Sequence, residues 1–294
     1  MMKRITAALL AAALFLTLTG CADASERQSR KTALRILRGD DLGYQLSTGT
    51  AVENQEVYND GSIVIQLGGI SGTPGDPQLV LAVKNGTRKE ITFTAQRCFI
   101  NGWQTDCWSD VYEIAGHSTI TATVSISSDL ELAQISDIRD IQLDFDLYDK
   151  DYNSIGTGSA SFQTNAESAE DSYTPSGTVL LDDGDYKVVA WLVRSGYDNS
   201  TRVCTYAENN TNRAVNVTNS KARLNGEPVE YWFFQDINAG ARRISSDSLY
   251  DSDSYDSIEL TDSDTLTYTL QISDSDSNVQ LLTQEVTLTL ADLQ

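Results

Sequence analysis

The sequence predicts an all-β protein built from two tandem antiparallel β-sandwiches. Three observations predict this fold class: short segments in which apolar and polar residues alternate, Asn-Gly pairs typical of hairpin turns, and an internal repeat at constant spacing. The chain has 294 residues, a length typical of about two domains, and 40% of them are hydrophobic. That fraction is high enough to build a buried core in each domain.

Alternation is clearest in the first half of the chain. Alternating residues lie on opposite faces of a strand, so each segment is expected to bury one face. The pattern favours an antiparallel sandwich over a parallel sheet with crossover helices. Only Ser128 to Ile135 has a helical pattern, in which Ser128 and Glu131 form a capping box. The apolar positions are Ile63, Ile65 and Leu67; Leu79, Leu81 and Val83; Ile91, Phe93 and Ala95; Ile120, Ala122, Val124 and Ile126; and Ile141, Leu143, Phe145 and Leu147.

The repeat has an offset of 124 residues in its central part and 125 near its end. It indicates two homologous domains, residues 51–165 and 178–294, joined by a polar linker at residues 166–177. Since the linker has few apolar residues, the two halves are expected to fold independently. The matching pairs are Asn85 with Asn209, Thr87 with Thr211, Asn101-Gly102 with Asn225-Gly226, Trp108 with Trp232, Ala115-Gly116 with Ala239-Gly240, and Ile141–Leu147 with Leu266–Ile272.

These motifs together resemble the immunoglobulin-like domains repeated in uncharacterised lipoproteins of anaerobic Gram-positive bacteria. The elements that carry the resemblance are the Asn-x-Thr strand end, the Asn-Gly hairpin, the Ala-Gly turn and the last alternating strand. It covers roughly Val57 to Phe162 and Leu181 to Leu290 and implies a fold but no known chemistry. The second copy departs from the pattern in its Ser/Asp-rich stretch, Ser245 to Asp264.

The first residues predict export and a lipid anchor. Lys3 and Arg4 precede an apolar run from Ile5 to Leu18, which is typical of a signal peptide and short for a membrane span. The sequence Leu18-Thr19-Gly20-Cys21 resembles the lipobox of bacterial lipoproteins. The resemblance implies a signal peptide at residues 1–20, a diacylglycerol on Cys21, and a location on the extracytoplasmic face of the cell membrane.

Residues 21–50 are predicted to form a basic tether behind this anchor. Five basic residues follow Cys21 closely, although the whole chain has a formal charge of -21. The tether could lie against an anionic lipid leaflet or be a merely solvated linker. Because acidic residues repel phosphate backbones, a nucleic-acid partner is excluded. The basic residues are Arg27, Arg30, Lys31, Arg35 and Arg38.

Two cysteines, Cys98 and Cys107, bracket the first Asn-Gly hairpin. Disulfides are common in exported proteins, so a bond between them is one alternative. If Asn101 and Gly102 are the turn residues, however, Cys98 faces Thr105 and Cys107 lies on the diagonal, about 7 to 8 Å away and beyond the usual reach of a disulfide. The other alternative is two partly buried thiols, which the repeat favours because the second copy has no cysteine at either position.

An acidic motif recurs near the end of each domain. Asp149, Asp151 and Asn153 match the first three ligand positions of a calcium loop, and so do Asp274, Asp276 and Asn278. The helix-loop-helix setting of such loops is missing, and Asp and Asn are also ordinary hairpin-turn residues. Turns are therefore favoured over calcium sites, and no cofactor is predicted.

Few other residues are candidates for a functional role. His117, the single histidine, follows an Ala-Gly turn and is expected on a surface loop. Cys204 has no obvious partner and is expected to be a small buried hydrophobe. Aromatic side chains could form a sugar-stacking platform. The coincidence of two of them in the repeat favours core packing instead. The four candidates are Trp103, Trp108, Trp191 and Trp232.

The sequence thus predicts a non-catalytic surface lipoprotein that displays two immunoglobulin-like domains to a cell-wall, glycan or protein partner. No nucleophile, metalloprotease or phosphate-binding motif is present. One alternative is a structural stalk without a ligand. The other is a polysaccharide-active enzyme, which would need a cleft with two carboxylates roughly 5 to 10 Å apart.

Overall fold

The computed structural model describes residues 24–111, 113–167, 173, 175–194, 200–261 and 263–289. The predicted signal peptide and Cys21 lie outside these residues. No helix in the described part of the chain is long and apolar enough to cross a membrane. The chain divides into two compact units: unit 1 comprises Met1–Cys98, Cys107–Ile126 and Ile141–Glu167, and unit 2 comprises Phe99–Asp106, Ser127–Asp140 and Ser168–Gln294.

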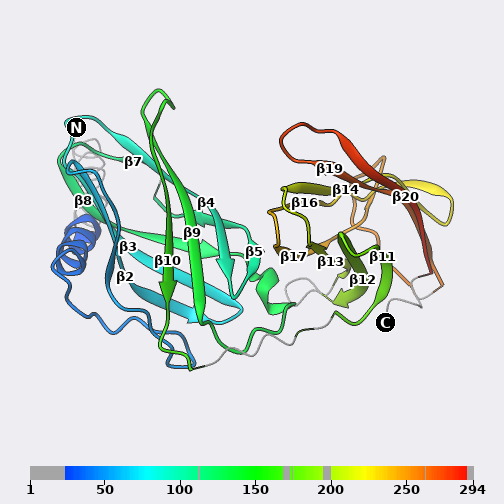
Figure 1. The fold of residues 1–294 in the computed structure, drawn as a ribbon, viewed down its shortest axis with the longest axis horizontal. Coiled ribbons are helices and arrows are strands. Elements are labelled where there is room, and N and C mark those ends of the chain that lie inside the picture. The colour runs from blue at the N-terminus through cyan, green and yellow to red at the C-terminus, as the bar shows by residue number, and fades with distance from the viewer. Residues whose placement is uncertain are drawn as a thin grey trace, which may run out of the picture. The chain divides into compact units, whose positions relative to one another are not determined.

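Unit 1 contains two sheets (Figure 1). The first has the strand order β1 (Gln55–Asn59), β2 (Ile63–Thr73), β3 (Asp76–Asn85), β8 (Ser118–Ile126) and β6 (Cys107–Ser109), and its neighbours are antiparallel. The second has the order β10 (Ser154–Gln163), β9 (Asp140–Asp149) and β4 (Ile91–Ile100), with β7 (Glu113–Ile114) paired to β4. The prediction of an all-β fold is confirmed.

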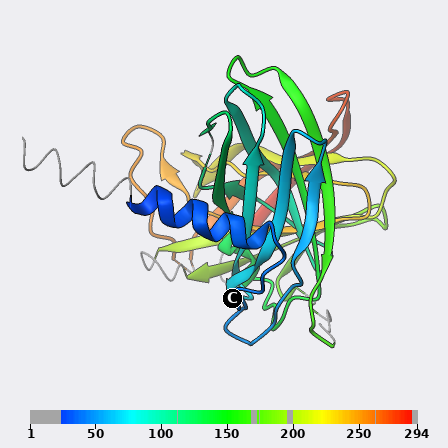
Figure 2. The same ribbon diagram turned by 90° about the vertical axis from the view of Figure 1, so that its left-hand side faces the viewer.

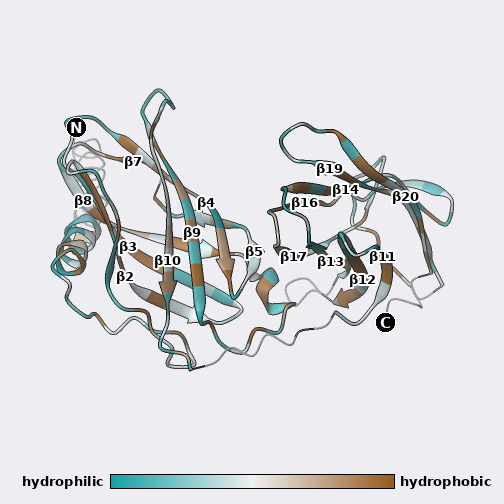
Figure 3. Cartoon of the chain, viewed as in Figure 1, coloured by the Kyte–Doolittle hydropathy of each residue, from teal (hydrophilic) through white to brown (hydrophobic). Residues whose placement is uncertain are grey.

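Alternating side chains of these strands form the core of unit 1. Along β9, Ile141, Leu143, Phe145 and Leu147 are buried, and bands of opposite hydropathy are visible in Figure 3. Phe93 of β4 lies with its ring centroid 5.6 Å from that of Phe145. Gly158 of β10 lies against the Phe145 ring so closely that a Cβ atom at this position would clash with it. The predicted one-sided burial is therefore observed along β9 and β4, whereas β3 buries both of its faces between Leu79 and Val83.

Residues 24–36 form a helix that packs on unit 1, where the sequence predicted a tether (Figure 2). Ala33 and Ile36 are buried against Val80 and Ala82 of β3. Ile36 also lies so close to Gly68 that any Cβ at Gly68 would clash with it. All five basic side chains are exposed, and apolar positions at helical spacing between them form the buried face of the helix.

Unit 2 also contains two sheets. The first has the order β5 (Trp103–Thr105), β17 (Arg242–Asp247), β13 (Thr201–Asn209), β12 (Tyr186–Arg194) and β11 (Thr178–Asp182). The second has the order β18 (Tyr250–Asp251), β15 (Glu227–Glu230), β14 (Val215–Leu224), β19 (Thr265–Asp274) and β20 (Gln280–Thr289), with β16 (Phe234–Ile237) paired to β14. The 3-10 helix η1 (Ser128–Glu131) belongs to unit 2, and its N-cap is Ser127, one residue before the predicted cap.

The hairpin that begins at Asn101 contributes to the core of unit 2. Asn101 and Gly102 have φ angles of 50° and 80°, which confirms the predicted left-handed turn. Trp103, the next residue, is fully buried, with its ring centroid 5.7 Å from that of Tyr206 and the Arg242 guanidinium 4.3 Å from its ring centroid. Residues of the first sequence repeat are thus part of the second compact unit.

Candidate functional site

The first acidic motif forms the turn between β9 and β10. Asp149 Oδ1 accepts hydrogen bonds from the backbone N–H groups of Asp151 at 2.9 Å and Asn153 at 3.0 Å. The Asn153 side-chain amide also donates to Asp149, and this bond contributes most to lowering the Asp149 pKa. The carboxylate therefore stabilises the turn by accepting backbone and amide donors.

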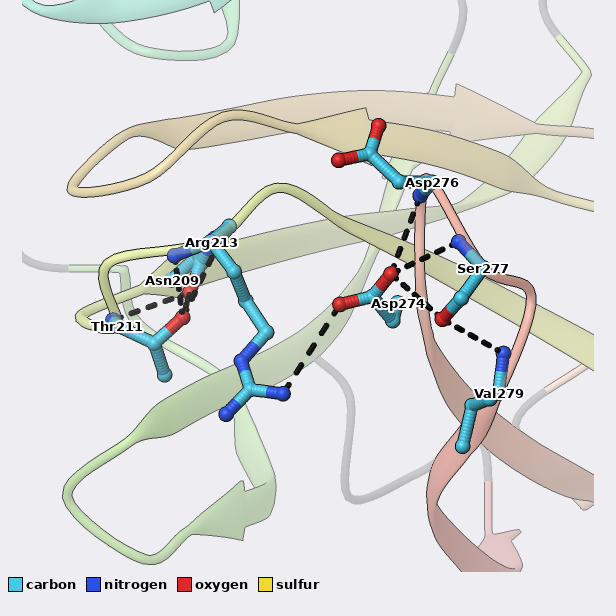
Figure 4. Close-up of polar contacts among 7 residues, drawn as sticks. All are labelled: Asn209, Thr211, Arg213, Asp274, Asp276, Ser277 and Val279. Carbon is cyan, nitrogen blue, oxygen red and sulfur yellow. Dashed lines mark hydrogen bonds and ion pairs between the residues drawn. The ribbon is translucent and has the colours of Figure 1, made fainter.

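The second acidic motif also forms a turn, between β19 and β20 (Figure 4). Ser277 supplies the donors here that Asn153 supplies in the first motif. The Asn278 backbone N–H donates to the Asp274 carbonyl at 2.9 Å. Asp274 Oδ1 accepts from the backbone N–H groups of Asp276 at 3.2 Å and Ser277 at 2.9 Å, and the Arg213 guanidinium lies 3.9 Å from its other oxygen. Hydrogen bonds from Ser277 lower the Asp274 pKa. Within the described residues, no group of three or more His, Cys, Asp or Glu side chains is placed to hold a metal ion.

The predicted thiols lie in different sheets of unit 1. Cys98 is a buried residue of β4, and Cys107, in β6, is partly buried; both are free. Their side chains nevertheless make a hydrogen-bonding contact, which together with burial raises the pKa of Cys98. The predicted diagonal geometry is wrong because the strand after the turn ends at Thr105 and β6 joins the other sheet.

Two further predictions concern single residues. His117 lies on an exposed turn, with a φ of 56°, as expected. Cys204 is fully buried in β13, opposite Trp191 of β12, as expected for a small hydrophobe. Burial raises the pKa of the Cys204 thiol.

The prediction that Trp108 and Trp232 pack in the cores is wrong. Trp108 is 49% exposed and Trp232 is 68% exposed. Each lies between inward-facing neighbours, since Ser109 beside the first and Phe233 beside the second are buried. Alternation along an extended segment therefore directs both tryptophans outward. The two tryptophans at matching repeat positions thus share an outward side-chain direction, and neither lies in a core.

Trp232 has an aromatic neighbour on the surface of unit 2. Phe234, in β16, is 46% exposed, and its ring stacks on Trp232 with centroids 6.1 Å apart and planes inclined by 20°. The planes of the two rings are nearly parallel, and both rings are exposed, so together they present apolar surface to solvent. Exposed apolar surface of this kind is typical of binding sites.

Polar side chains continue this surface across the sheet. Phe234 pairs with Thr218 of β14, Thr218 with Gln271 of β19, and Gln271 with Thr283 of β20. Directly paired residues project from the same face of a sheet, so these four side chains form one row. Three strand spacings of about 4.8 Å give the row a length of about 14 Å. We call Trp232, Phe234, Thr218, Gln271 and Thr283 the aromatic-polar face.

A concave site lies in unit 1. It is a groove of about 810 Å³ lined mainly by amides, hydroxyls and backbone groups. Its two carboxylates, Asp41 and Glu53, are both exposed, and Asp41 accepts a hydrogen bond from the backbone N–H of Gly43 at 2.8 Å. A catalytic acid needs a buried, apolar environment to hold a proton at neutral pH. Neither carboxylate has one.

Comparison with known proteins gives no family. No family profile and no curated protein matches the chain. Solved structures with some similarity are the GAE domain of yeast GGA1 (15% identity, 37% of this chain and 97% of that one, TM-score 0.25), the CupB2 chaperone of Pseudomonas aeruginosa (9%, 72% and 92%, 0.20) and a calcium-binding mutant of β-glucuronidase 2 of Bacteroides uniformis (9%, 73% and 26%, 0.23). Similarity this low supports no statement about function.

Proposed function

We propose that this protein is a non-catalytic, lipid-anchored extracytoplasmic protein whose immunoglobulin-like domains bind a neutral glycan through the aromatic-polar face of unit 2. The observation that carries this proposal is the stacked, exposed pair Trp232 and Phe234. The anchor rests on the lipobox-like sequence that ends at Cys21.

A sugar fits this surface chemically. One face of a pyranose ring presents C–H groups that pack on aromatic rings, and its rim presents hydroxyls that need hydrogen-bond partners. The aromatic-polar face offers both, because Thr218, Gln271 and Thr283 supply neutral hydroxyl and amide groups beside Phe234. A row of about 14 Å is long enough for two or three sugar rings.

Charge argues for a neutral glycan. The chain carries a formal charge of -21, so its surface repels polyanions. This repulsion acts at short range, where salt does not screen the charges. No basic side chain belongs to the aromatic-polar face. An acidic polysaccharide would therefore have no counter-charge at the site.

The two alternatives from the sequence have less support. An enzyme would need a protected pair of carboxylates, whereas both carboxylates of the groove in unit 1 are exposed. A purely structural role as a stalk does not explain why two large aromatic rings stack on the exposed surface.

A binding experiment with two tryptophan variants tests the glycan proposal. The chain from Ala22 onward is measured for binding to soluble β-glucan and for co-sedimentation with chitin and cellulose. Trp232→Ala is expected to weaken binding about tenfold, since losing one stacking ring costs about 1.4 kcal/mol. Trp108→Ala is the matched control, because it removes an exposed tryptophan outside the aromatic-polar face. Equal binding by both variants would contradict the proposal.

The anchor is tested separately by Cys21→Ser. The substitution is expected to release the protein from the membrane fraction or to leave its precursor uncleaved, because the thiol that receives the lipid is gone. Immunoblots of fractionated cells measure both outcomes. Unchanged membrane retention with normal processing would contradict lipidation.

A further inference from the structure

The thiols of Cys98 and Cys107 meet in the interior of unit 1. Cys98 is fully buried in β4. Cys107 lies two residues from the buried Ser109 in β6, and side chains two apart point to the same face of a strand. Trp108, which lies between Cys107 and Ser109 in the chain, points to solvent. Both sulfur atoms therefore face inward, and their side chains are in hydrogen-bonding contact.

A second contact fixes β6 against β4. The Ser109 hydroxyl donates a hydrogen bond of 3.1 Å to the backbone carbonyl of Phe93, and this bond is buried. On its other side β6 pairs with β8, where Cys107 lies opposite Ile126. One backbone ladder and one buried side-chain bond thus hold β6 in place and join it to β4 of the facing sheet.

We propose that Cys98 and Cys107 form a disulfide that joins β4 of one sheet of unit 1 to β6 of the other. The inference rests on the proposed function in one respect, since export supplies the oxidising compartment in which such bonds persist. The fold itself brings the thiols together in any compartment. Cys204 is the natural comparison within the chain, because it is buried in unit 2 and takes no part in this pair.

The bond would form by thiol-disulfide exchange with a disulfide oxidant. Cys107 is the more exposed of the two, so its thiolate attacks the oxidant first and releases one oxidant thiolate. The Cys98 thiolate then attacks the Cys107 sulfur of the mixed disulfide and releases the second. The two cysteines lose two electrons and two protons. The oxidant gains both and leaves as two thiols.

The consequence for the fold concerns the edge of a sheet. β6 is a short strand of three residues at the end of its sheet. A covalent link to β4 would hold this edge closed and would reduce the freedom of the unfolded chain between the two cysteines. Reduction is therefore expected to lower the melting temperature of unit 1 by several degrees.

Peptide mapping tests the bond directly. The chain from Ala22 onward is incubated with oxidised glutathione, denatured, and alkylated with iodoacetamide without a reductant. Trypsin, which cuts after Arg97 and Arg139, releases one peptide with both cysteines, and a second cut before Asp106 separates them. We expect two fragments joined by a disulfide, a mass lower by two hydrogens than that of the dithiol, and alkylation of Cys204 alone.

Matched variants make the outcome decisive. In Cys107→Ala, Cys98 should become fully alkylated on denaturation, and a reductant should no longer change the melting temperature. Cys204→Ala should keep the bond and its reductant sensitivity. Alkylation of both Cys98 and Cys107 in the oxidised wild-type chain would overturn the proposal, even if glycan binding is intact. Loss of glycan binding by Trp232→Ala is measured on a different unit and would not affect this result.

Discussion

The two sequence repeats place the same asparagine in the same role. Asn85, in the first repeat, donates from its side chain to the backbone carbonyls of Lys89, Ile114 and Ala115, at 2.8 to 3.2 Å. Asn209, in the second, donates to Arg213, Ile237 and Asn238 over the same range. Each asparagine also accepts from a threonine two residues later, Thr87 or Thr211, at 2.7 Å. The duplication has therefore kept its internal hydrogen bonds.

The repeats also share their strand order but differ at one sheet edge. The order β1-β2-β3-β8 in unit 1 corresponds to β11-β12-β13-β17 in unit 2. In unit 1 the free edge of β8 is covered by β6, in antiparallel pairing. In unit 2 the edge of β17 is covered by β5, through a single parallel pair between Trp103 and Arg242. The same strand order can therefore cover an exposed sheet edge in two different ways.

The largest expected effect comes from removing the side chain that covers the edge in unit 2. Trp103→Ala should destabilise unit 2 by about 3 to 5 kcal/mol, because it empties a fully buried site against Tyr206. The buried thiol of Cys204 reports on this unit, so pulsed alkylation in denaturant measures its unfolding.

The equivalent position of the second repeat provides the control. Glu227 corresponds to Trp103 by the repeat offset and is exposed. Glu227→Ala should change stability by less than about 0.5 kcal/mol. If both substitutions leave Cys204 equally protected, Phe99–Asp106 is not part of the second unit, and the halves fold independently as the linker composition predicted.

An intermediate and equal effect is expected from the conserved asparagines. Asn85→Ala and Asn209→Ala should each cost about 2 to 4 kcal/mol, since each leaves buried carbonyls without a donor. Equilibrium denaturation of each variant measures the loss. Asn210→Ala is the control, because Asn210 is exposed and its side chain makes one long bond, to the Gly184 carbonyl at 3.3 Å. A large cost at one asparagine only would show that the repeats have diverged in energetics.

Much of the fold could be predicted from local pattern. Alternation gave the strands, and the Asn-Gly pairs gave turns in which Asn101 and Asn225 have φ angles of 50° and 54°. These signals are local because a turn needs particular residues at particular positions. The helix at residues 24–36 was not predicted. Its apolar stripe, which includes Ala33 and Ile36, is short and lies among five basic residues.

The candidate site was harder to predict. Trp108 and Trp232 share a position in the repeat, and shared aromatic positions usually indicate a core, yet both are exposed. Tyr231 to Phe234 is an uninterrupted aromatic run, so no apolar-polar alternation in the sequence indicates which of its side chains are exposed. The alternating burial that directs Trp232 and Phe234 to one side is seen in the structure alone. The Cys98 and Cys107 contact depends on a strand that changes sheets after Thr105. The spacing of residues in the sequence does not indicate that the chain changes sheets there.

A partly buried acid distinguishes the units in a further way. Asp247 of β17 lies in unit 2, and burial, with a smaller contribution from the nearby Asp129 carboxylate, raises its pKa from 3.8 to about 6. A hydrogen bond from Ser245 and the charges of Arg243 and Arg202 oppose this rise without cancelling it.

The smallest expected effect is therefore a pH dependence confined to unit 2, since the first repeat has Thr123 at the position of Asp247. A carboxyl whose pKa is raised by folding binds its proton more tightly in the folded state. The free energy of unfolding should consequently fall as pH rises from about 4 to about 6, and the penalty should be complete at pH 7. Asp247→Asn should flatten this part of the profile and raise the melting temperature at pH 7 by a few degrees. Melting curves between pH 4 and 7 measure it, with the exposed Asp253→Asn as control. Parallel profiles for wild type and Asp247→Asn would mean that Asp247 stays solvated, and would remove this difference between the units.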